Sequence, residues 1–199
     1  VCGEVSLRIH HHLLRSTDSL QEIQRVFSHQ QSLAQCRQWL TMNLPHAEQV
    51  NVSSNAEAAR RAAEDPAAAA IAGEQAGELY KLASLVRNIE DDPNNTTRFL
   101  VIGHIDTSAT GEDKTSIMVS SRNEAGALYE LLAPLARHKV SMSRIESRPS
   151  HRGMWEYVFF LDLDGHVTDP AIVEVLNEIR QQAVMLKLLG SYPRSVLDL

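Results

Sequence analysis

Three short strings in this sequence carry side chains whose types and spacing could bind or transform a small molecule. Asn95–Phe99 places a hydroxyl beside a guanidinium at the start of an apolar run. Gly126–Tyr129 opens a helical stretch, where free backbone N–H groups and the positive end of the helix dipole can hold a carboxylate. Glu146–Pro149 ends the next apolar run and contributes a carboxylate of its own. Together the strings predict a catalytic module followed by a small-molecule sensor.

The overall composition excludes several classes of function. A chain of 199 residues is long enough for one or two domains. Its net charge of −6 argues against nucleic acid as the main partner, because phosphate binding needs clustered Lys and Arg. No apolar run approaches the ~18 residues that suggest a membrane span. The two cysteines have neither disulfide-framework nor metal-ligand spacing. We therefore expect a cytoplasmic protein with neither a nucleic-acid nor a membrane partner.

The first half of the chain alternates between strand and helix patterns. Val5, Leu7 and Ile9 share one side of a period-two run, which predicts a strand with one buried face. Ser28 precedes a helical pattern, and its hydroxyl is expected to cap that helix. The expected elements are a strand at 4–9, a helix at 29–43, a strand at 48–52, a helix from 54 or 55 to 64, an apolar run at 67–72, a helix at 74–82 and a strand at 97–102. This alternation favours an α/β layer with parallel pairing.

A polar stretch at 104–114 is interpreted as a linker, and a different pattern follows it. Strands are expected at 115–120, 140–146, 155–163 and 184–189, helices at 125–138 and 172–179, and a turn at 149–153. Pro134 lies inside the first of these helices and is expected to kink it or to end its regular hydrogen bonding. The order βαββαβ fits the ferredoxin-like plan, in which two helices cover one sheet face and leave the other free for a partner.

The second half resembles an ACT domain, the amino-acid-sensing module of metabolic enzymes. Its first strand–helix turn, Asn123–Leu128, is similar to the ligand loop of that family. Combined with Gly126-Ala127-Leu128, the string Glu146–Pro149 resembles the phenylalanine-binding pair of prephenate dehydratases. The resemblance implies that Glu146 pairs with an α-amino group and that Pro149 restricts the local backbone. The implied effector site comprises Asn123, Gly126, Ala127, Leu128, Glu146, Ser147, Arg148 and Pro149.

The first half resembles the later part of the prephenate dehydratase catalytic domain. Thr97-Arg98-Phe99 matches the Thr-Arg-Phe motif of that family, and Ser28-His29 with Gln35-Cys36 is similar to its Ser-His and Gln-Cys segment. Gln30 stands where the family usually carries proline. The implied fold class is α/β, with a partial two-lobe, periplasmic-binding-protein-like dehydratase domain before a ferredoxin-like ACT domain. The expected divisions are a catalytic portion at 1–103, a linker at 104–114 and the ACT domain at 115–194.

The resemblance also implies a reaction without a cofactor. Prephenate loses its ring carboxylate as CO2 and its hydroxyl as water, and a donor aimed at the departing oxygen lowers the barrier. Thr97 is expected to be that donor, and Arg98 to fork two N–H bonds onto a substrate carboxylate. Gln35 and Ser28 are expected to fix the substrate through neutral hydrogen bonds, and Phe99 to pack beneath the site. Phenylalanine is the expected feedback effector, in a homodimer or tetramer formed through ACT domains.

Several alternatives stand beside this hypothesis. His10-His11-His12 invites a metal site, but neighbouring residues on a strand point to opposite faces, so we predict no metal there. The family's N-terminal segment is not found after Val1, so we expect a piece of a larger protein with little or no dehydratase activity by itself. The resemblance to bifunctional enzymes implies an upstream chorismate mutase. The rival function is a non-catalytic amino-acid-binding regulatory module, which the absent segment favours and the retained Thr97 and Gln35 oppose.

Overall fold

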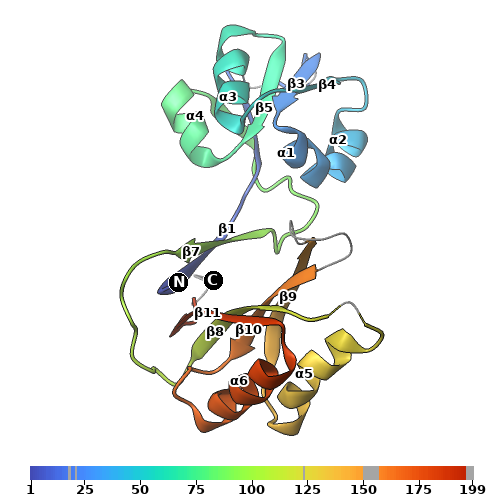
Figure 1. The fold of residues 1–199 in the computed structure, drawn as a ribbon. Coiled ribbons are helices and arrows are strands. Elements are labelled where there is room, and N and C mark those ends of the chain that lie inside the picture. The colour runs from blue at the N-terminus through green and yellow to red at the C-terminus, as the bar shows by residue number, and fades with distance from the viewer. Residues whose placement is uncertain (18, 21, 123, 150–156, 196–199) are drawn as a thin grey trace. The chain divides into compact units, whose positions relative to one another are not determined.

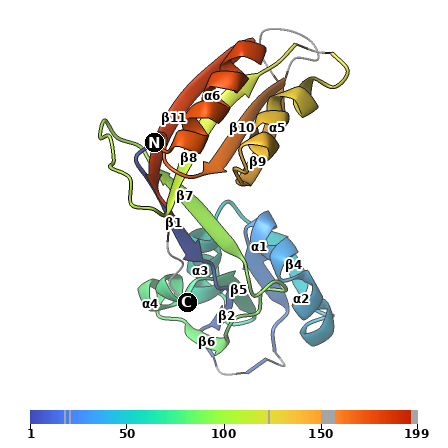
Figure 2. The same ribbon diagram turned by 90° about the horizontal axis from the view of Figure 1, so that it is seen from below.

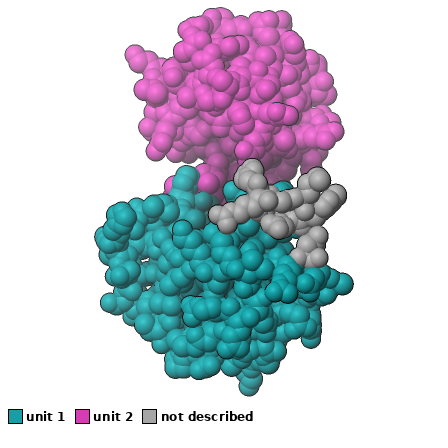
Figure 3. Space-filling view, viewed as in Figure 1, with its two compact units in different colours: residues 1–6, 98–199 teal, residues 7–97 magenta. Residues whose placement is uncertain are grey.

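The computed structural model describes residues 1–17, 19–20, 22–122, 124–149 and 157–195, and its contacts group the chain into two compact units. Unit 1 contains Val1–Ser6 and Arg98–Leu199, and unit 2 contains Leu7–Thr97 (Figure 3). The expected end of the catalytic portion at residue 103 stays a prediction. None of the helices in the described ranges is both long and apolar enough to cross a bilayer.

Unit 2 is built on a five-stranded mixed sheet in the order β4-β3-β5-β2-β6. Its strands are β2 (His12–Arg15), β3 (Arg25–Ser28), β4 (Glu48–Asn51), β5 (Ala68–Ala72) and β6 (Ala83–Val86). Strand β3 runs parallel to β4 and β5, whereas β2 runs antiparallel to β5 and β6. The sequence pattern indicates β4 and β5 but misses β2, β3 and β6.

Helices cover both faces of this sheet, α1 (Gln30–Gln35) and α2 (Arg37–Asn43) on one and α3 (Asn55–Glu64) and α4 (Glu74–Tyr80) on the other (Figure 1). The all-buried strand β5 serves both cores because its side chains alternate. Ala68, Ala70 and Ala72 pack in the core that contains α3 residues. Ala69 and Ile71 pack in the core that contains residues of α1 and α2.

The single helix expected at 29–43 is two helices that meet at Cys36. The Asp91 carboxylate accepts hydrogen bonds from the backbone N–H groups of Gln38 and Trp39, which satisfies the start of α2. The expected cap at Ser28 is also wrong, because His29 is the N-cap of α1 and its Nδ1 accepts from Gln31 N at 3.3 Å. The sequence pattern does not reveal the break between α1 and α2, because apolar residues continue at helical spacing across Cys36.

Strand β1 (Gly3–Arg8) pairs with β7 (Thr96–Val101) in a two-stranded sheet, and its burial reverses the sequence expectation. Val5 and Leu7 are 44% and 49% exposed, whereas Glu4 is only 8% exposed. Alternation predicts the strand but not which side is covered. Here Glu4 is buried because its carboxylate finds two cationic partners, Arg98 and Lys114.

The main sheet of unit 1 has the βαββαβ order that the sequence predicts (Figure 2). Its elements are β8 (Asp113–Ser120), α5 (Ala127–Arg137), β9 (Met142–Pro149), β10 (Tyr157–Asp164), α6 (Pro170–Gln182) and β11 (Met185–Pro193). The four strands are antiparallel in the order β11-β8-β10-β9, and both helices lie on one face. Ile117, Val119, Leu161 and Leu163 pack there against α5 and α6. This arrangement confirms the ferredoxin-like half of the fold class.

Two local features of unit 1 bear on the sequence expectations. Helix α5 continues through Pro134, which is buried inside it, so the proline does not end the helix, and the expected kink stays a prediction. The polar stretch before β8 is tied to unit 1, since Thr107 Oγ1 donates to the Ser191 carbonyl at 2.5 Å and Asp113 accepts from the backbone N–H of Thr110 and of Gly111. Of the expected turn at 149–153, Pro149 belongs to β9 and the rest lies outside the described residues.

Candidate active site

A cavity of about 340 Å³ lies in unit 2 where β3 and β4 run into helices α1 and α3. Ligands of α/β sheets bind outside the carboxyl ends of the strands, where successive connections pass to opposite faces. Here the connection after β3 carries α1 and α2, and the connection after β4 carries α3. The cavity is lined by Ile9, His11, His29, Gln31, Ser32, Gln35, Ser53, Ser54, Asn55, Asn95 and Thr97.

The start of α3 contributes backbone donors to this cavity. Ser54 is its N-cap, and the Ser54 hydroxyl accepts from Glu57 N at 3.1 Å. The first N–H groups of a helix have no partner within the helix, and the helix dipole adds partial positive charge there. An anionic ligand in the cavity is therefore favoured, although no Lys or Arg is among the residues that line it.

A chain of hydrogen bonds fixes Gln35 at the cavity wall. His11 Nε2 and Gln35 Oε1 are 2.8 Å apart, and Gln35 Nε2 donates to Asn95 Oδ1 at 3.0 Å. Asn95 in turn donates to the carbonyl of Ile9 at 3.2 Å. Because a carbonyl oxygen only accepts, the proton of His11 is on Nε2 in this arrangement. His11 is 2% exposed, and its Nδ1 has no hydrogen-bond partner among the described residues.

Ser28 lies beneath the cavity rather than in its wall. It is fully buried, with its hydroxyl 2.7 Å from the Ile71 carbonyl and 3.0 Å from Asn55 Oδ1. Asn55 does line the cavity, and its Nδ2 donates to the Ser32 hydroxyl at 3.0 Å. The sequence predicts a direct contact between Ser28 and the substrate, whereas the buried Ser28 hydroxyl contacts Asn55 instead.

The Thr97 side chain is exposed and lines the cavity together with Gln35. Its hydroxyl has no hydrogen-bond partner within the described part of the chain, so it is free to contact a ligand. Neighbouring residues of a strand point to opposite sides, so Arg98 projects away from the side that Thr97 and Phe99 share. Phe99 is 50% exposed and is not packed beneath the cavity as expected.

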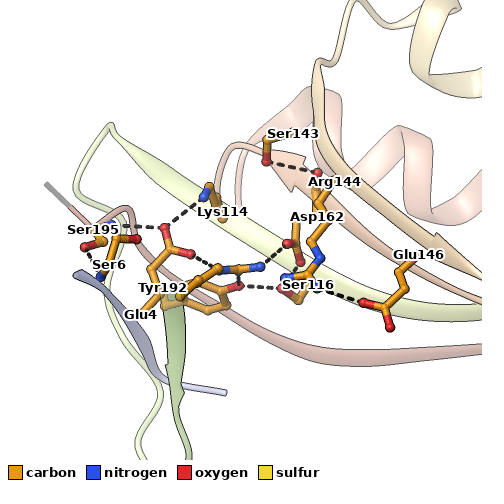
Figure 4. Close-up of polar contacts among 11 residues, drawn as sticks. Glu4, Ser6, Lys114, Ser116, Ser143, Arg144, Glu146, Asp162, Tyr192 and Ser195 are labelled. Atoms are coloured by element: carbon orange, nitrogen blue, oxygen red, sulfur yellow. Dashed lines mark hydrogen bonds and ion pairs between the residues drawn. The ribbon is translucent and has the colours of Figure 1, made fainter. Parts of the chain in front are cut away.

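The Arg98 guanidinium is engaged inside unit 1 by Glu4, Asp162 and Tyr192. Figure 4 labels these three partners. The guanidinium donates to Glu4 and Asp162, each at 2.6 Å, and to the Tyr192 hydroxyl at 2.7 Å. A guanidinium already neutralised by two carboxylates is a poor receptor for a third. These hydrogen bonds therefore argue against the substrate contact that the sequence suggests for Arg98.

The expected effector residues are divided between two places in unit 1. Gly126 precedes α5 with a φ of 86°, a left-handed conformation that favours glycine. Ala127 lines a cavity of about 500 Å³ with other residues of α5, the end of α6 and the connection from α6 to β11. Glu146 lies on β9 opposite Phe160, and its carboxylate contacts Arg144 and Arg148 at 2.7 Å. These contacts hold the pKa of Glu146 below its usual range, with Arg148 the larger cause.

The remaining effector residues follow the same division. Leu128 is in the first turn of α5 and is 38% exposed, and Ser147 lies on β9 opposite Phe159. Arg148 stacks over the Phe160 ring at 5.5 Å, and Pro149 ends β9. Asn123 lies outside the described residues. The residues of β9 are not among those that line the Ala127 cavity.

Of the residues that line the unit 2 cavity, the sequence predicts only Gln35 and Thr97 as site residues; His11, Ser32, Asn55 and Asn95 are among those it misses. As a sequence pattern the triple histidine raises only the question of a metal site, and no group of three or more metal-ligating side chains occurs in the described ranges. Asn55 had a usable signal, because Ser53-Ser54-Asn55 stands between a strand and a helix, where parallel sheets place their ligand contacts.

Comparison with known proteins agrees with both halves of the chain. The family model for prephenate dehydratase matches residues 1–107, and the model for the ACT domain matches residues 115–181. The bifunctional chorismate mutase/prephenate dehydratase of Pseudomonas aeruginosa is 54% identical over 198 residues, which are 99% of this chain and 54% of that protein. The chain thus spans about half the length of the curated relatives it matches.

Two solved structures resemble this one closely. The prephenate dehydratase of Arthrobacter aurescens in complex with L-Phe has a TM-score of 0.87 at 35% identity, over 98% of this chain and 66% of that one. A protein described as a novel type of quorum-quenching acylase has a TM-score of 0.84 at 30% identity, over 98% of this chain and 72% of that one.

Proposed function

This chain belongs to the prephenate dehydratase family, and from that premise we propose that it carries residues that convert prephenate to phenylpyruvate, CO2 and water. We further propose that phenylalanine regulates the reaction at the ACT domain. The observation that carries the first proposal is the cavity of unit 2, where Thr97, Gln35 and Asn55 meet the start of α3. The whole reaction belongs to the natural polypeptide, and an upstream chorismate mutase domain stays a prediction.

The chemistry needs an anion site and one directed hydrogen-bond donor. Prephenate carries two carboxylates, and the free N–H groups at the start of α3 suit one of them. When the ring C–CO2 bond breaks, its electron pair enters the ring and the C–OH bond breaks to release hydroxide. Thr97 donates a hydrogen bond to the departing oxygen, which takes its proton from water. Because a threonine hydroxyl is a weak acid, its contribution is oriented stabilisation of the developing charge.

Gln35 and Asn55 supply neutral contacts to the same substrate. Each is held by a neighbour, Gln35 by His11 and Asn55 by Ser28 and Ser32. Side chains that are already oriented lose little freedom when the substrate binds, and this fixed geometry favours the reactive arrangement. Arg98 is given no substrate contact in this proposal, because its hydrogen bonds are directed into unit 1.

The effector site is best explained by two copies of the chain. Gly126, Ala127 and Leu128 lie at the start of α5, whereas Glu146 lies on β9, the edge strand of the sheet. An edge strand is free to pair or pack with a second copy, which would bring the helix start of one ACT domain to the Glu146 of another. We therefore place phenylalanine between paired ACT domains, in a cytoplasmic homodimer or tetramer. Sedimentation that finds only monomers in the presence of phenylalanine would contradict this assembly.

Two alternative functions are less well supported. A non-catalytic amino-acid-binding module would have no use for the free Thr97 hydroxyl beside Gln35. Acyl transfer, the activity named for one structural relative, needs a nucleophile activated by an adjacent base. Among the described residues that line the cavity, no hydroxyl is hydrogen-bonded to a histidine ring nitrogen.

The deciding experiment replaces Thr97 with Ala and, separately, with Ser in the full natural polypeptide. We expect Thr97→Ala to lower kcat by about 100-fold or more, as the loss of one transition-state donor does. Thr97→Ser keeps the hydroxyl and should retain most of the activity. Phenylalanine binding, measured by calorimetry, should be unchanged in both. Wild-type turnover by Thr97→Ala would exclude the proposed role, and phenylalanine binding without turnover in the unmodified protein would favour the regulatory module.

A further inference from the structure

Arg98 is the centre of a buried polar network that joins β7 to the four-stranded sheet β8–β11, called the ACT sheet below. Figure 4 shows its partners Glu4, Asp162 and Tyr192 with Lys114 and Ser116 beside them. The Nε, Nη1 and Nη2 of Arg98 each donate to a different group, and its side chain is only 17% exposed. Asp162 lies on β10 and Tyr192 on β11, so the guanidinium contacts two strands of that sheet. Glu4 comes from β1, which pairs with β7.

A second layer of contacts orients the partners of Arg98. Lys114 Nζ donates to Glu4 Oε1 at 2.9 Å, and Ser195 N donates to the same oxygen at 3.0 Å. The Ser116 hydroxyl is 2.5 Å from both Asp162 Oδ1 and the Tyr192 hydroxyl. Two cations face two carboxylates, so the charges balance. A buried network of this kind is costly to break, because the loss of one partner leaves another charge unpaired.

Arg98 connects this network to the proposed active site, because it directly follows Thr97 in the chain. Thr97 and Arg98 are consecutive residues of β7 and project to opposite sides of it. Thr97 lines the unit 2 cavity, whereas Arg98 is held by side chains of unit 1. One peptide bond therefore connects the proposed hydrogen-bond donor to a residue that is held from three directions.

We propose that Arg98 is a positioning residue, which fixes the Thr97 end of β7 to the ACT sheet through Asp162 and Tyr192. The effect of phenylalanine on turnover passes through this contact, since a shift of β10 or β11 against β7 displaces the backbone that carries Thr97. A displacement of about 1 Å at a reacting group is enough to lower a rate by about 100-fold. This inference rests on the proposed function for Thr97, and it assigns to Arg98 a duty other than substrate binding.

The test uses two nearly isosteric variants of the partners, Asp162→Asn and Tyr192→Phe, in the full natural polypeptide. Neither residue lines the unit 2 cavity. The matched control is Asp164→Asn, because Asp164 lies two residues further along β10 on the same side and pairs with Arg194 at 2.5 Å. We expect Asp162→Asn and Tyr192→Phe each to lower kcat by about tenfold, which is the loss of one hydrogen bond to a charged group. KM should stay within about twofold, since substrate contacts are kept, and Asp164→Asn should resemble the wild type.

Two further measurements separate positioning from general destabilisation. Amide hydrogen exchange over residues 96–101 should speed up about tenfold in Asp162→Asn and Tyr192→Phe but not in Asp164→Asn. Phenylalanine should bind Asp162→Asn with wild-type affinity and yet lose its effect on turnover. Arg98→Lys should recover part of the kcat that Arg98→Met loses.

The outcomes distinguish this inference from the proposed function. Wild-type exchange over residues 96–101 in both partner variants overturns the positioning role of Arg98, whatever the enzyme assay shows. Equal losses in Asp164→Asn and Asp162→Asn overturn it as well, because the contact would then be merely structural. Absence of dehydratase turnover in the unmodified protein rejects the proposed function, and the exchange measurement still decides whether Arg98 holds β7.

Discussion

At the scale of single residues, neighbours within one motif can have different roles. Thr97 and Arg98 are neighbours, yet one has a free hydroxyl at a cavity and the other has its donors occupied by Glu4, Asp162 and Tyr192. The difference follows from strand geometry, because alternate residues meet different surroundings. A motif therefore identifies which residues matter more readily than it identifies what each one does.

The acid sensitivity of Glu4 provides a prediction at this scale. Burial raises the pKa of the Glu4 carboxyl, but hydrogen bonds and charges from Lys114, Ser195 and Arg98 outweigh burial and place it below the ordinary value. The stabilisation is therefore complete above about pH 4.3, the ordinary glutamate pKa, and is lost as the pH falls through the lower folded-state pKa. We expect Glu4→Gln to lower the free energy of unfolding at pH 7 by about 3 kcal/mol.

Urea unfolding at a series of pH values measures this effect. The difference between wild type and Glu4→Gln should shrink as the pH falls below 4, because the wild-type carboxylate is then protonated as well. Glu112→Gln is the control, since Glu112 is exposed in the same unit. A difference that does not depend on pH would show that charge is not what Glu4 contributes.

At the scale of elements, the alanine-rich helix α3 is shaped by the strand it covers. Ala58, Ala59 and Ala62 are buried against β5, where Ala68, Ala70 and Ala72 face the same core. Small side chains on both elements let helix and strand approach closely. This packing holds the start of α3, and with it Asn55, at the cavity.

A larger side chain in this contact should separate the two elements. We expect Ala59→Leu to destabilise the protein by about 1–3 kcal/mol, because the surrounding core has no room for extra methylene groups. It should also raise KM for prephenate, since Asn55 moves with the helix. Ala63→Leu, at an exposed position of the same helix, should stay within about 0.5 kcal/mol of wild type.

Chemical denaturation and steady-state kinetics of the two variants test this prediction. If Ala63→Leu is as destabilising as Ala59→Leu, then helix propensity and not packing against β5 explains the loss. If Ala59→Leu unfolds the chain altogether, Ala59→Val is a milder change with the same expected direction.

At the scale of the whole molecule, each unit has its own core and its own candidate ligand. The unit 2 cores surround the five-stranded sheet, and the unit 1 core lies between the ACT sheet and helices α5 and α6. The proposed substrate residues belong to unit 2, and the proposed effector residues belong to unit 1. A ligand that binds one folded unit stabilises that unit by mass action.

Calorimetric scans should therefore show two unfolding transitions that respond to different ligands. Phenylalanine at about 100 times its dissociation constant should stabilise the unit 1 transition by about 2.7 kcal/mol. Glu146→Gln should abolish that shift while leaving the unit 2 transition unchanged. If phenylalanine stabilises only the unit 2 transition, the effector binds unit 2 and the proposed site in unit 1 is rejected.

Much of the secondary structure was predictable because it is encoded locally. The βαββαβ order, the strand at β4 and the helix that follows Ser54 all follow from period, capping and breaker signals within about ten residues. The short strands β2, β3 and β6 and the break at Cys36 were not predictable in the same way, because their stability comes from neighbours in the sheet and from the distant cap at Asp91.

The amino-acid sequence alone determined the motifs that identify the family, the α/β alternation and the ferredoxin-like plan, since each is a pattern among nearby residues. Only the tertiary structure decided that Ser28 is buried, that His11 holds Gln35, that Val5 is exposed while Glu4 is covered, and that Arg98 faces the ACT sheet. The physical reason is that burial and hydrogen-bond partners are set by segments far apart in the chain. Arg98 and Asp162 are 64 residues apart, and no local period records which carboxylate a guanidinium will meet.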